Sequence, residues 1–459
     1  MSCHIFLRRI LAIWLTKLAV IAGKIAGKKG SSTPGRLALK IYPNILRDLA
    51  KEVSGPIIVT CGTNGKTTTN NLLAAILKST GKRIVCNYVG ANMLEGVVTA
   101  FVMSTRFWGK IEASFAAIEL DEISTVKVFE HFLPQYIMVT NLFRDQLDRY
   151  GEIDITIDVL NRAIEMAKGA ELILNADDPL VVSLARKDRK CHFFGVPSKV
   201  IDDPDSNIKE GRFCRNCGEE LDYQFYHYSQ LGMYACPSCD FKRPEAEFDA
   251  HNVDLSRGIK MKVQNNEIYV KYRGFYNIYN ILAAYCASSL VKVSLSEINS
   301  VLNAYKPQIG RMEEFDIAGK TVVFNLSKNP AGFNQAIRTL LQDGSKKSVV
   351  VAINDNAQDG KDISWIWDVD FEELKGNVYE IATSGIRHHD VYLRMKYEDF
   401  DLSHITDYGD IESAIKMMLK SDCETLYVLV NYTALFSTQN ILKRLETRNN
   451  ENHDRTSLS

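Results

Sequence analysis

The sequence carries almost no net charge. Its 459 residues include 55 basic and 56 acidic side chains, which leave a formal charge of −1. Proteins that bind nucleic acid usually carry a basic patch or a clear excess of positive charge. This balance therefore argues against nucleic acid as a partner. A composition of 46% apolar and 24% charged residues is that of a soluble globular protein.

The sequence also lacks a hydrophobic run long enough to cross a bilayer. The apolar stretch Ile10–Ala22 is interrupted by Thr16 and Lys17, and it falls short of the roughly 20 residues that a spanning helix needs. No A-x-A cleavage site follows, which argues against a signal peptide. We expect residues 1–36 to form an amphipathic helix that packs on the next domain, followed by a linker. Because basic residues flank the stretch, contact with an anionic membrane surface is the alternative.

The ten cysteines do not form the dense pattern of a disulfide-stabilised secreted protein. Six are scattered, which suggests a reducing, cytoplasmic location. The other four form two C-x-x-C pairs separated by 18 residues, a spacing typical of two zinc knuckles. A redox pair would stand alone beside a βαβ unit, so we expect a structural zinc ion held by four sulfur ligands. The expected ligands are Cys214, Cys217, Cys236 and Cys239.

Short apolar runs alternate with longer helical patterns from residue 57 to about residue 200. This alternation indicates an α/β fold in which helices wrap a parallel sheet. A polar, cysteine-containing insertion interrupts the pattern, and a second series of strands and helices begins near Pro307. The expected parts are a central domain at 37–305 with the insertion at about 205–245, a smaller α/β domain at 306–445, and a disordered tail at 446–459.

A candidate phosphate-binding loop follows the first strand of the central domain. The run I-I-V-T, which starts at Ile57, leads into C-G-T-N-G-K-T-T and then a helix, the order that phosphate binding requires. The glycines let backbone N–H groups face the phosphates, the lysine supplies positive charge, and a threonine hydroxyl can bind magnesium. A plain Gly-Asn turn before a helix is the alternative. The candidate nucleotide-binding residues are Gly62, Thr63, Asn64, Gly65, Lys66, Thr67 and Thr68.

Magnesium needs an acidic ligand as well. Glu119 ends the apolar run F-A-A-I-E and is the candidate, with Asp121 and Glu122 behind it. Carboxylates at the carboxyl ends of strands in open α/β sheets often belong to functional sites, although such a residue can also cap a helix. We therefore expect Thr67 and Glu119 to hold Mg²⁺, and Lys66 and Glu119 to take part in catalysis.

Further motifs follow the loop along the chain. The segment T-N-L-F-R-D-Q-L-D-R-Y-G begins at Thr140, N-A-D-D-P at Asn175, G-F-Y-N-I-Y-N at Gly274 and G-R-M-E at Gly310. Together with G-T-N-G-K-T-T, these segments resemble the Mur ligase and folylpolyglutamate synthetase superfamily. The resemblance implies ATP and Mg²⁺ as cofactors, contact of Asn277 with the nucleotide base, and contact of Arg311 with the phosphates.

The C-terminal domain departs from the peptide-adding Mur ligases. Where those carry D-Y-A-H-N-P, this chain has N-L-S-K-N-P at 325–330, so both the acidic residue and the histidine are replaced. The segments beginning at Asn354, Thr383 and Val430 resemble the MurT family. That resemblance implies a ligase that phosphorylates the α-carboxyl of D-glutamate in the lipid II stem peptide. Ammonia from a GatD-like glutaminase subunit then converts the activated carboxyl to D-isoglutamine.

The same resemblance implies an aspartate that completes a triad with the Cys–His pair of the glutaminase. Asp355 follows the apolar run S-V-V-V-A-I-N and is the candidate, with Asp359 and Asp362 as reserves. A turn-capping role would explain the sequence N-D-N equally well. No cysteine of this chain lies in a G-x-C-x-G nucleophile pattern, so glutamine hydrolysis would need another polypeptide.

Two residue pairs are assigned to structure rather than to chemistry. His388 and His389 fall between a predicted strand and a predicted helix, and no second ligand cluster lies near them in sequence, so we expect them in a loop. Trp365 and Trp367 are expected to pack in the core or at an interface.

Two other functions stay open. An amino-acid-adding Mur or folylpolyglutamate synthetase-like ligase would share the ATP chemistry, but the altered residues at 325 and 328 argue against it. A nucleotide-dependent scaffold would use the loop without ligation. Such a scaffold has no evident use for Lys66, Glu119, Asn277 and Arg311 together.

Overall fold

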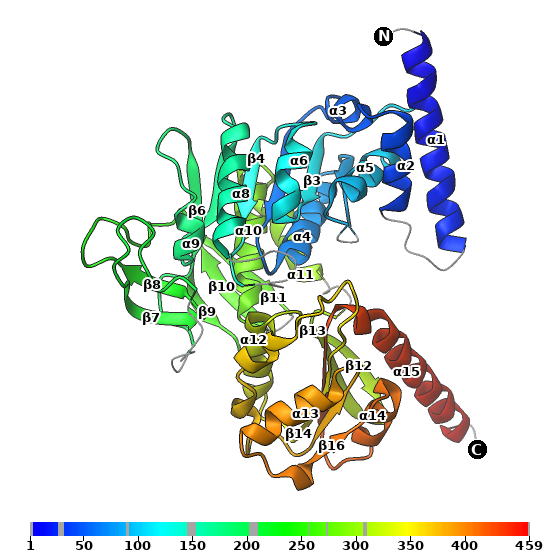
Figure 1. Ribbon diagram of the computed structural model, residues 1–459, viewed down its shortest axis with the longest axis vertical. Helices are drawn as coiled ribbons and strands as arrows, with labels where there is room; N and C mark the ends of the chain where they lie inside the picture. Colours follow the sequence, from blue (N-terminus) through cyan, green and yellow to red (C-terminus); the bar gives the residue numbers. More distant parts are fainter. Residues whose placement is uncertain are drawn as a thin grey trace.

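The protein is built on two large sheets that follow one another along the chain, and a small two-stranded sheet is inserted in the first domain (Figure 1). The structure is a computed structural model. It describes residues 3–25, 32–88, 91–144, 153–201, 210–256, 258–271, 274–305 and 310–457.

The central domain contains a nine-stranded sheet in the order β11-β10-β9-β6-β5-β4-β1-β3-β2. The strands from β2 to β9 in this order are parallel, and β10 and β11 extend the sheet as antiparallel strands. Several parallel strands are apolar at nearly every position, which is typical of strands covered on both faces. The strands are β1 (Ile57–Cys61), β2 (Ile84–Cys86), β3 (Phe115–Glu119), β4 (Tyr136–Val139), β5 (Glu171–Asn175), β6 (Cys191–Gly195), β9 (Phe248–Asp254), β10 (Ile259–Val263) and β11 (Asn266–Val270).

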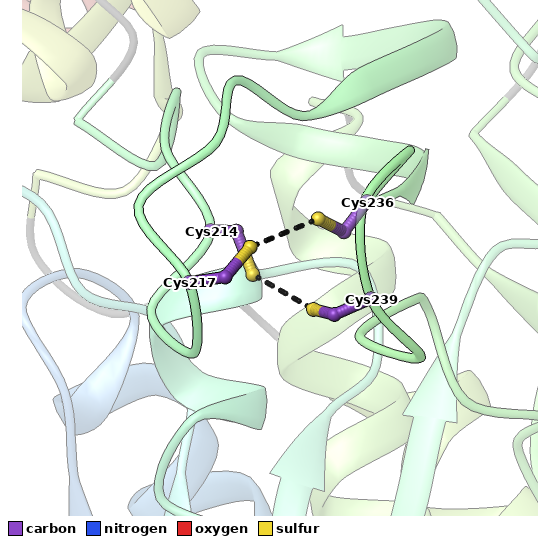
Figure 2. Close-up of side chains that lie close together, drawn as sticks. All are labelled: Cys214, Cys217, Cys236 and Cys239. Carbon is purple, nitrogen blue, oxygen red and sulfur yellow. Dashed lines mark hydrogen bonds between the residues drawn. The ribbon is translucent and has the colours of Figure 1, made fainter.

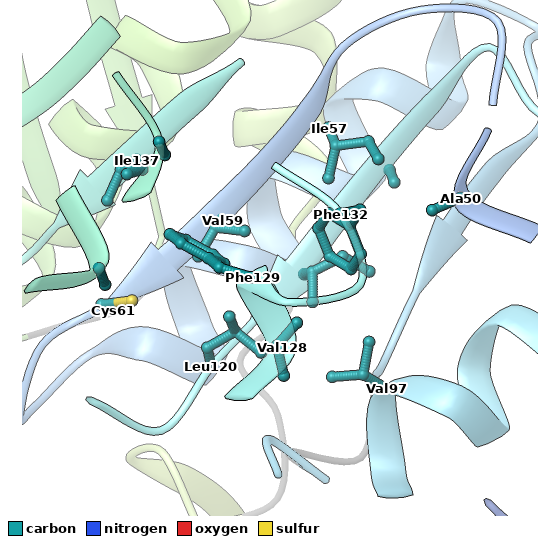
Figure 3. Packing of buried hydrophobic residues seen from close by; sticks show 14 of the residues in the cluster. Ala50, Ile57, Val59, Cys61, Val97, Leu120, Val128, Phe129, Phe132 and Ile137 are labelled. Atoms are coloured by element: carbon teal, nitrogen blue, oxygen red, sulfur yellow. The ribbon is translucent and has the colours of Figure 1, made fainter. Parts of the chain in front are cut away.

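Helices cover both faces of this sheet and create two apolar layers. Alternate residues of β1 point to opposite sides. Ile57, Val59 and Cys61 join the first layer, where Figure 3 shows Val59 beside Phe129, whereas Ile58 joins the second. The first layer is covered by α3 (Ile45–Ala50), α5 (Leu94–Met103), α6 (Thr125–Phe129), α8 (Ile153–Met166) and α9 (Pro179–Val182), and the second by α4 (Lys66–Ser79), α10 (Tyr276–Leu290) and α11 (Leu295–Ala304).

The N-terminal helix α1 (Cys3–Ile25) packs on α2 (Thr33–Ile41) and α5. Its Ala12 and Ile13 join the first apolar layer. The helix is not amphipathic as expected, because leucines such as Leu11 and Leu18 remain exposed on its other face. Among the described residues, no helix combines the length and the apolar character that crossing a bilayer demands.

The cysteine-containing insertion forms a separate lobe at the end of β6 (Figure 1). Its two strands, β7 (Asp222–Tyr228) and β8 (Leu231–Ala235), pair antiparallel with each other. The chain then returns to the sheet as β9, which pairs in parallel with β6. The lobe therefore occupies the crossover between two neighbouring parallel strands.

The C-terminal domain contains a six-stranded sheet in the order β12-β13-β17-β14-β15-β16. The edge strand β12 is antiparallel, and the other pairs are parallel. The helices α12 (Pro330–Leu341) and α13 (His388–Tyr397) cover one face, and α14 (Ile411–Met418) and α15 (Leu435–Ser457) cover the other. The strands are β12 (Glu313–Ile317), β13 (Lys320–Leu326), β14 (Lys347–Ala352), β15 (Ile381–Ser384), β16 (Ile405–Asp407) and β17 (Thr425–Val430).

The end of the chain differs from expectation. Residues 446–459 were expected to be disordered, but α15 continues through them to Ser457. Leu442 and Leu435 anchor the first turns of α15 in the apolar layer. Extending an existing helix adds one hydrogen bond per residue without a new nucleation step, so a polar sequence can continue a helix that packing has started.

Candidate active site

The candidate phosphate loop lies between β1 and α4, at the carboxyl end of the strand. Gly62 and Gly65 have φ angles of 118° and 83°, in the left-handed region that favours glycine. A Cβ atom on Gly65 would lie 2.0 Å from Oδ1 of Asn280, so a side chain cannot be accommodated there. The loop therefore leads directly into the N-terminus of a 14-residue helix, whose free N–H groups and dipole favour an anion.

Residues from the end of β4 hold the shape of the loop. The N–H of Asn64 donates to Oδ1 of Asn141 at 2.8 Å, and the hydroxyl of Thr140 donates to the carbonyl of Asn64 at 2.8 Å. The N–H of Thr63 donates to the carbonyl of Asn141 at 2.8 Å. The T-N pair therefore braces the phosphate loop. The remainder of that motif, at 145–151, lies outside the described residues.

Lys66 forms a buried ion pair with Glu122. Its Nζ lies 2.9 Å from Oε1 of Glu122, and both side chains are less than one-tenth exposed. The same Oε1 accepts a hydrogen bond from the N–H of Gly62 at 2.8 Å. Burial lowers the pKa of Lys66, but the carboxylates of Glu122 and Asp121 outweigh this effect and the pKa is raised. Lys66 is therefore charged. The sequence had suggested Glu122 only as a reserve metal ligand behind Glu119, and its pairing with Lys66 was not predicted.

Glu119 is buried at the end of β3, and one of its carboxylate oxygens has no hydrogen-bond partner among the described residues. Its Oε1 accepts a hydrogen bond from Asn92 at 3.1 Å, whereas its buried Oε2 has no partner among the described residues. Burial raises the pKa of Glu119, and the charges of Lys66 and Arg311 and the hydroxyl of Thr67 oppose that rise. An unpaired carboxylate oxygen beside a threonine hydroxyl is a donor set that suits a hard cation such as Mg²⁺.

Two sequence motifs far from the loop reach the same place. The hydroxyl of Thr69 donates to Oδ1 of Asn280 at 3.2 Å, and Nδ2 of Asn280 donates to Oδ1 of Asn277 at 3.0 Å. Arg311 is half-buried, and its charge acts on both Glu119 and Tyr276. The structure thus brings the asparagine helix α10 and the arginine to the phosphate loop.

The N-A-D-D-P segment at the end of β5 supports the site through hydrogen bonds and an ion pair. Nδ2 of Asn175 donates to the carbonyl of Thr140 at 2.9 Å. Asp177 pairs with the guanidinium of Arg243 at 2.7 Å. Asp178 accepts from the N–H of Leu142 at 2.8 Å, and burial raises the pKa of Asp178 to about 7. These residues hold neighbouring strand ends together.

One contact joins the phosphate loop to the C-terminal domain. The amides of Asn64 and Asn329 bond to each other in both directions, at 3.3 and 3.2 Å. Asn329 also caps α12 by accepting from the N–H of Gly332 at 2.9 Å. The N-L-S-K-N-P segment, in which this chain departs from peptide-adding ligases, therefore faces the loop. Sequence reasoning missed this role of Asn329, because 265 residues separate the two asparagines.

The three candidate aspartates of the C-terminal domain have different surroundings. Asp359 is buried and binds both the N–H and the hydroxyl of Thr433, and Asp362 caps its own turn at Ser364. Asp355 is about one-quarter exposed beyond β14 and accepts one bond, from Nε of Arg387 at 3.0 Å, through Oδ2. Because Thr433 occupies both oxygens of Asp359, Asp355 is better placed than Asp359 to offer an oxygen to an outside group.

His388 and His389 are not loop residues as expected. They form the first turn of α13, and their Nδ1 atoms lie 2.7 and 2.6 Å from the two carboxylate oxygens of Asp407. The expectation was wrong because Asp407 ends another strand, β16, and pairing of β15 with β16 brings it to the helix. Trp365 packs against Phe333, with ring centroids 5.5 Å apart, as a packing role requires.

The four cysteines of the inserted lobe converge (Figure 2). The sulfur atoms of Cys214 and Cys239 are 3.5 Å apart, as are those of Cys217 and Cys236. Each C-x-x-C pair lies in a tight turn, closed by a bond from the N–H of Cys214 to Glu219 and from that of Cys236 to Phe241. The two similar turns thus place the four sulfur atoms close to one another.

Comparison with known proteins agrees with this arrangement. Residues 59–288 match the family described as "Mur ligase middle domain", and residues 326–435 match "MurT ligase C-terminal". The chain is 37% identical to "Lipid II isoglutaminyl synthase (glutamine-hydrolyzing) subunit MurT" of Staphylococcus aureus (strain COL), across 94% of this chain and 96% of that one. It is 32% identical to the protein of the same name from Streptococcus pneumoniae (strain ATCC BAA-255 / R6), across 93% and 97%.

Solved structures share the fold. A pseudomurein peptide ligase type C from Methanothermus fervidus aligns with a TM-score of 0.68 at 22% identity, over 87% of this chain and 80% of that one. MurF from Thermotoga maritima in complex with ADP aligns with a TM-score of 0.59 at 16% identity, over 90% and 85%.

The buried ion pair predicts a specific pattern of stability. Lys66→Ala should lower the free energy of unfolding by about 3–5 kcal/mol, because the buried carboxylate of Glu122 loses its counter-charge. Adding Glu122→Gln should restore part of that loss, since an amide oxygen can still accept from Gly62. Chemical denaturation of both variants measures the difference. Lys127→Ala, at an exposed lysine of α6, is the control and should change stability by less than about 0.5 kcal/mol. Equal stability of Lys66→Ala and the wild type would contradict the prediction.

Proposed function

The chain belongs to the MurT family of Mur ligases, and on that basis we propose that it is the ligase subunit of a glutamine-hydrolysing lipid II isoglutaminyl synthase. It amidates the α-carboxyl of D-glutamate in the lipid II stem peptide during peptidoglycan synthesis. The observation that carries this proposal is the contact between the phosphate loop and the N-L-S-K-N-P segment, which lacks the acidic residue and the histidine of amino-acid-adding ligases.

The reaction needs two steps, because a carboxylate is a poor electrophile. The γ-phosphoryl group of ATP passes to the carboxylate oxygen and ADP leaves. Ammonia then attacks the acyl carbon, phosphate departs, and the nitrogen loses a proton. Lys66 and the loop N–H groups hold the phosphates, with Arg311 and Asn277 assigned to the phosphates and the base. Thr67 and Glu119 would hold Mg²⁺, which neutralises the charge of the transferring phosphoryl group.

The main alternative is a ligase that adds an amino acid. A relative named UDP-N-acetylmuramoylalanine–D-glutamate ligase, from Thermoanaerobacter pseudethanolicus (strain ATCC 33223 / 39E), is 25% identical over 82% of this chain. This likeness is weaker than that to the MurT subunits. A nucleotide-dependent scaffold is also less favoured, because Glu119 keeps a buried oxygen that only a cation or a donor would satisfy.

ATP-dependent amidation tests the proposal directly. The purified chain, given ATP, Mg²⁺, ammonium chloride and lipid II, should form D-isoglutamine, as measured by mass spectrometry together with release of ADP. Glu119→Gln should reduce the rate by about 10²–10³-fold, the loss typical when one charge-stabilising group is removed. Glu130→Gln, at an exposed glutamate, should leave the rate unchanged. Ligation of an amino acid in place of ammonia would support the alternative ligase, and nucleotide binding without turnover would support the scaffold.

A partner glutaminase would supply the ammonia, and Asp355 is the residue we assign to its active site. A glutaminase with a Cys–His pair needs a carboxylate to orient the histidine and to stabilise the imidazolium. Asp355 is held by Arg387 through one oxygen, and it lies at the carboxyl edge of the C-terminal sheet. This arrangement leaves the second oxygen for the partner's histidine. Asp359 is less suitable because Thr433 occupies both of its oxygens.

Replacing Asp355 should separate the two nitrogen sources. In the complex with its glutaminase, Asp355→Asn should lower glutamine-dependent amidation by about 10⁴-fold, because the amide would orient the wrong histidine tautomer. Amidation from ammonium chloride should persist, since the ATP site lies elsewhere. Asp422→Asn, at an exposed aspartate before β17, serves as the control and should leave both activities unchanged. Equal loss with both nitrogen sources would assign Asp355 to folding or to the ligase site.

We assign a structural zinc ion to the four cysteines of the lobe. Four thiolates at the usual Zn–S distance of about 2.3 Å would be separated by roughly 3.8 Å in a tetrahedron, close to the 3.5 Å between paired sulfurs. With four sulfur ligands, no position is open for water. Among the described residues, the buried apolar cluster of the lobe consists of Leu221, Tyr234, Phe241 and the ligands Cys214 and Cys236, with Val182 of α9 packed against them, so metal binding would supply much of the lobe's folding free energy.

The zinc assignment predicts one ion per chain in protein purified without chelators. Cys236→Ser should abolish zinc binding and lower the melting temperature, because the lobe loses the ion that joins its two turns. Cys286→Ser, at a buried cysteine outside the lobe, should keep the zinc. Inductively coupled plasma mass spectrometry and thermal denaturation provide the two readouts, and a wild-type protein without zinc would refute the assignment.

A further inference from the structure

The N-terminal helix exposes an apolar stripe along its whole length. At 3.6 residues per turn, positions 7, 11, 18 and 25 fall on one line that extends for about 27 Å. Leu7 is 60% exposed and Ile25 is 83% exposed. An apolar helix stripe is normally covered by another part of the protein or by a partner, whereas these side chains of α1 remain exposed. The N-terminal apolar face comprises Leu7, Leu11, Leu18, Ile21 and Ile25, together with Phe107 and Trp108.

The opposite side of the helix is fixed to the domain. Arg9 is buried and pairs with Glu52 at 2.6 Å, and its guanidinium also donates to the carbonyl of Gly109 at 2.7 Å. Nζ of Lys17 donates to the carbonyl of Thr105 at 2.7 Å. These contacts hold α1 against both the domain and the 105–109 loop. The exposed stripe is therefore a fixed surface feature.

Two aromatic residues of that loop extend the apolar face. The ring of Phe107 lies 4.9 Å from that of Trp14 and 5.1 Å from that of Trp108. Phe107 is 63% exposed and Trp108 is 75% exposed, although a water-soluble surface rarely gathers such side chains. Aromatic side chains are enriched where proteins meet the boundary between lipid and water.

Charge distinguishes this part of the chain from the rest. Residues 1–47 contain nine Lys and Arg residues and no Asp or Glu, whereas the whole chain has a formal charge of −1. Arg8 and Lys24 are exposed on α1, and by helical periodicity they lie on opposite flanks of the stripe. An apolar stripe between basic flanks is the pattern of helices that lie in the interface of anionic membranes.

We propose that the N-terminal apolar face docks on an anionic lipid bilayer, with α1 parallel to the membrane surface. The leucines and the two aromatic rings enter the boundary of the acyl chains, and Arg8 and Lys24 contact anionic headgroups. Figure 1 shows α1 along the outer edge of the central domain, and among the described residues its leucines on this side are exposed.

The charge pattern argues against the other occupants. A symmetric dimer through this face would place the same basic flanks of two copies against each other. The proposed glutaminase contact lies at the carboxyl edge of the C-terminal sheet, around Asp355, which is in another domain. An anionic lipid surface would cover the apolar stripe and would also attract the positive charges beside it.

The biological role of this docking rests on the proposed function, because an enzyme with a lipid-linked substrate has to reach that substrate at the membrane. Docking would concentrate the enzyme where that substrate lies. It can be tested without turnover, so its failure would leave the proposed ligation untouched.

Vesicle sedimentation with the full-length chain tests the docking. The wild type should bind vesicles of phosphatidylglycerol mixed with phosphatidylcholine, and it should bind vesicles of phosphatidylcholine alone more weakly. The double variant Leu11→Glu/Leu18→Glu should partition at least about 100-fold more weakly, because two leucines leave the lipid and two negative charges meet it. The matched control Leu133→Glu/Leu393→Glu changes two exposed leucines elsewhere and should bind like the wild type.

Further measurements separate this outcome from its rivals. The double variant should retain the wild-type melting temperature and the amidation of detergent-solubilised substrate, while losing turnover of vesicle-embedded substrate. No binding of the wild type to anionic vesicles, or equal binding by the double variant, overturns the proposal. Loss of self-association or of glutaminase binding in the double variant, measured by analytical ultracentrifugation, overturns it in favour of a protein partner.

Discussion

Parallel pairing of β1 with β3 and β4 brings three strand ends to one edge of the nine-stranded sheet. Lys66 starts the helix after β1, Glu119 ends β3, and Asn141 follows β4. The register aligns Thr60 with Glu119 and Cys61 with Val139. A shift by one residue would turn Glu119 to the opposite face and away from the loop. The geometry of the candidate site thus depends on the register of two buried strand pairs.

The two buried carboxylates of the site, Glu122 and Glu119, have different surroundings and different roles. Glu122 neutralises Lys66 and also holds the N–H of Gly62, so the loop and the lysine share one anchor. Glu119 is equally buried, yet one of its oxygens is unpaired among the described residues. Burying a carboxylate without a partner is costly, and it is tolerated at functional sites where a ligand supplies the missing contact. One carboxylate therefore organises the site, and the other keeps an oxygen that the proposed Mg²⁺ would bind.

Local sequence was enough to predict the loop, the two cysteine turns of the inserted lobe and the alternating strands and helices of the C-terminal domain. Each of these depends on neighbours in the chain: glycine at positive φ in the loop, C-x-x-C spacing in the turns, and apolar runs in the strands. The contacts that sequence could not predict join distant segments. Glu122 pairs with Lys66, Asn329 with Asn64, and Asp407 with two histidines only because the sheets bring their strands together. The sequence offered membrane contact of the N-terminal stretch as an alternative, but composition cannot tell which apolar side chains of α1 remain uncovered.

The two proposed reactions share one edge of the C-terminal sheet. Asn329 follows the end of β13, and Asp355 follows the end of β14, with β17 between the two strands. Two strand spacings of about 4.8 Å put these ends roughly 10 Å apart. Asn431, which follows β17, bonds to the backbone of Asn354 and keeps the ends aligned. Because Asn329 touches the phosphate loop, ammonia released beside Asp355 would travel along this edge to reach an acyl phosphate. A glutaminase docked at the opposite edge would be separated from the acyl phosphate by the length of the strands, so the proposed partner would bind on the side of Asp355.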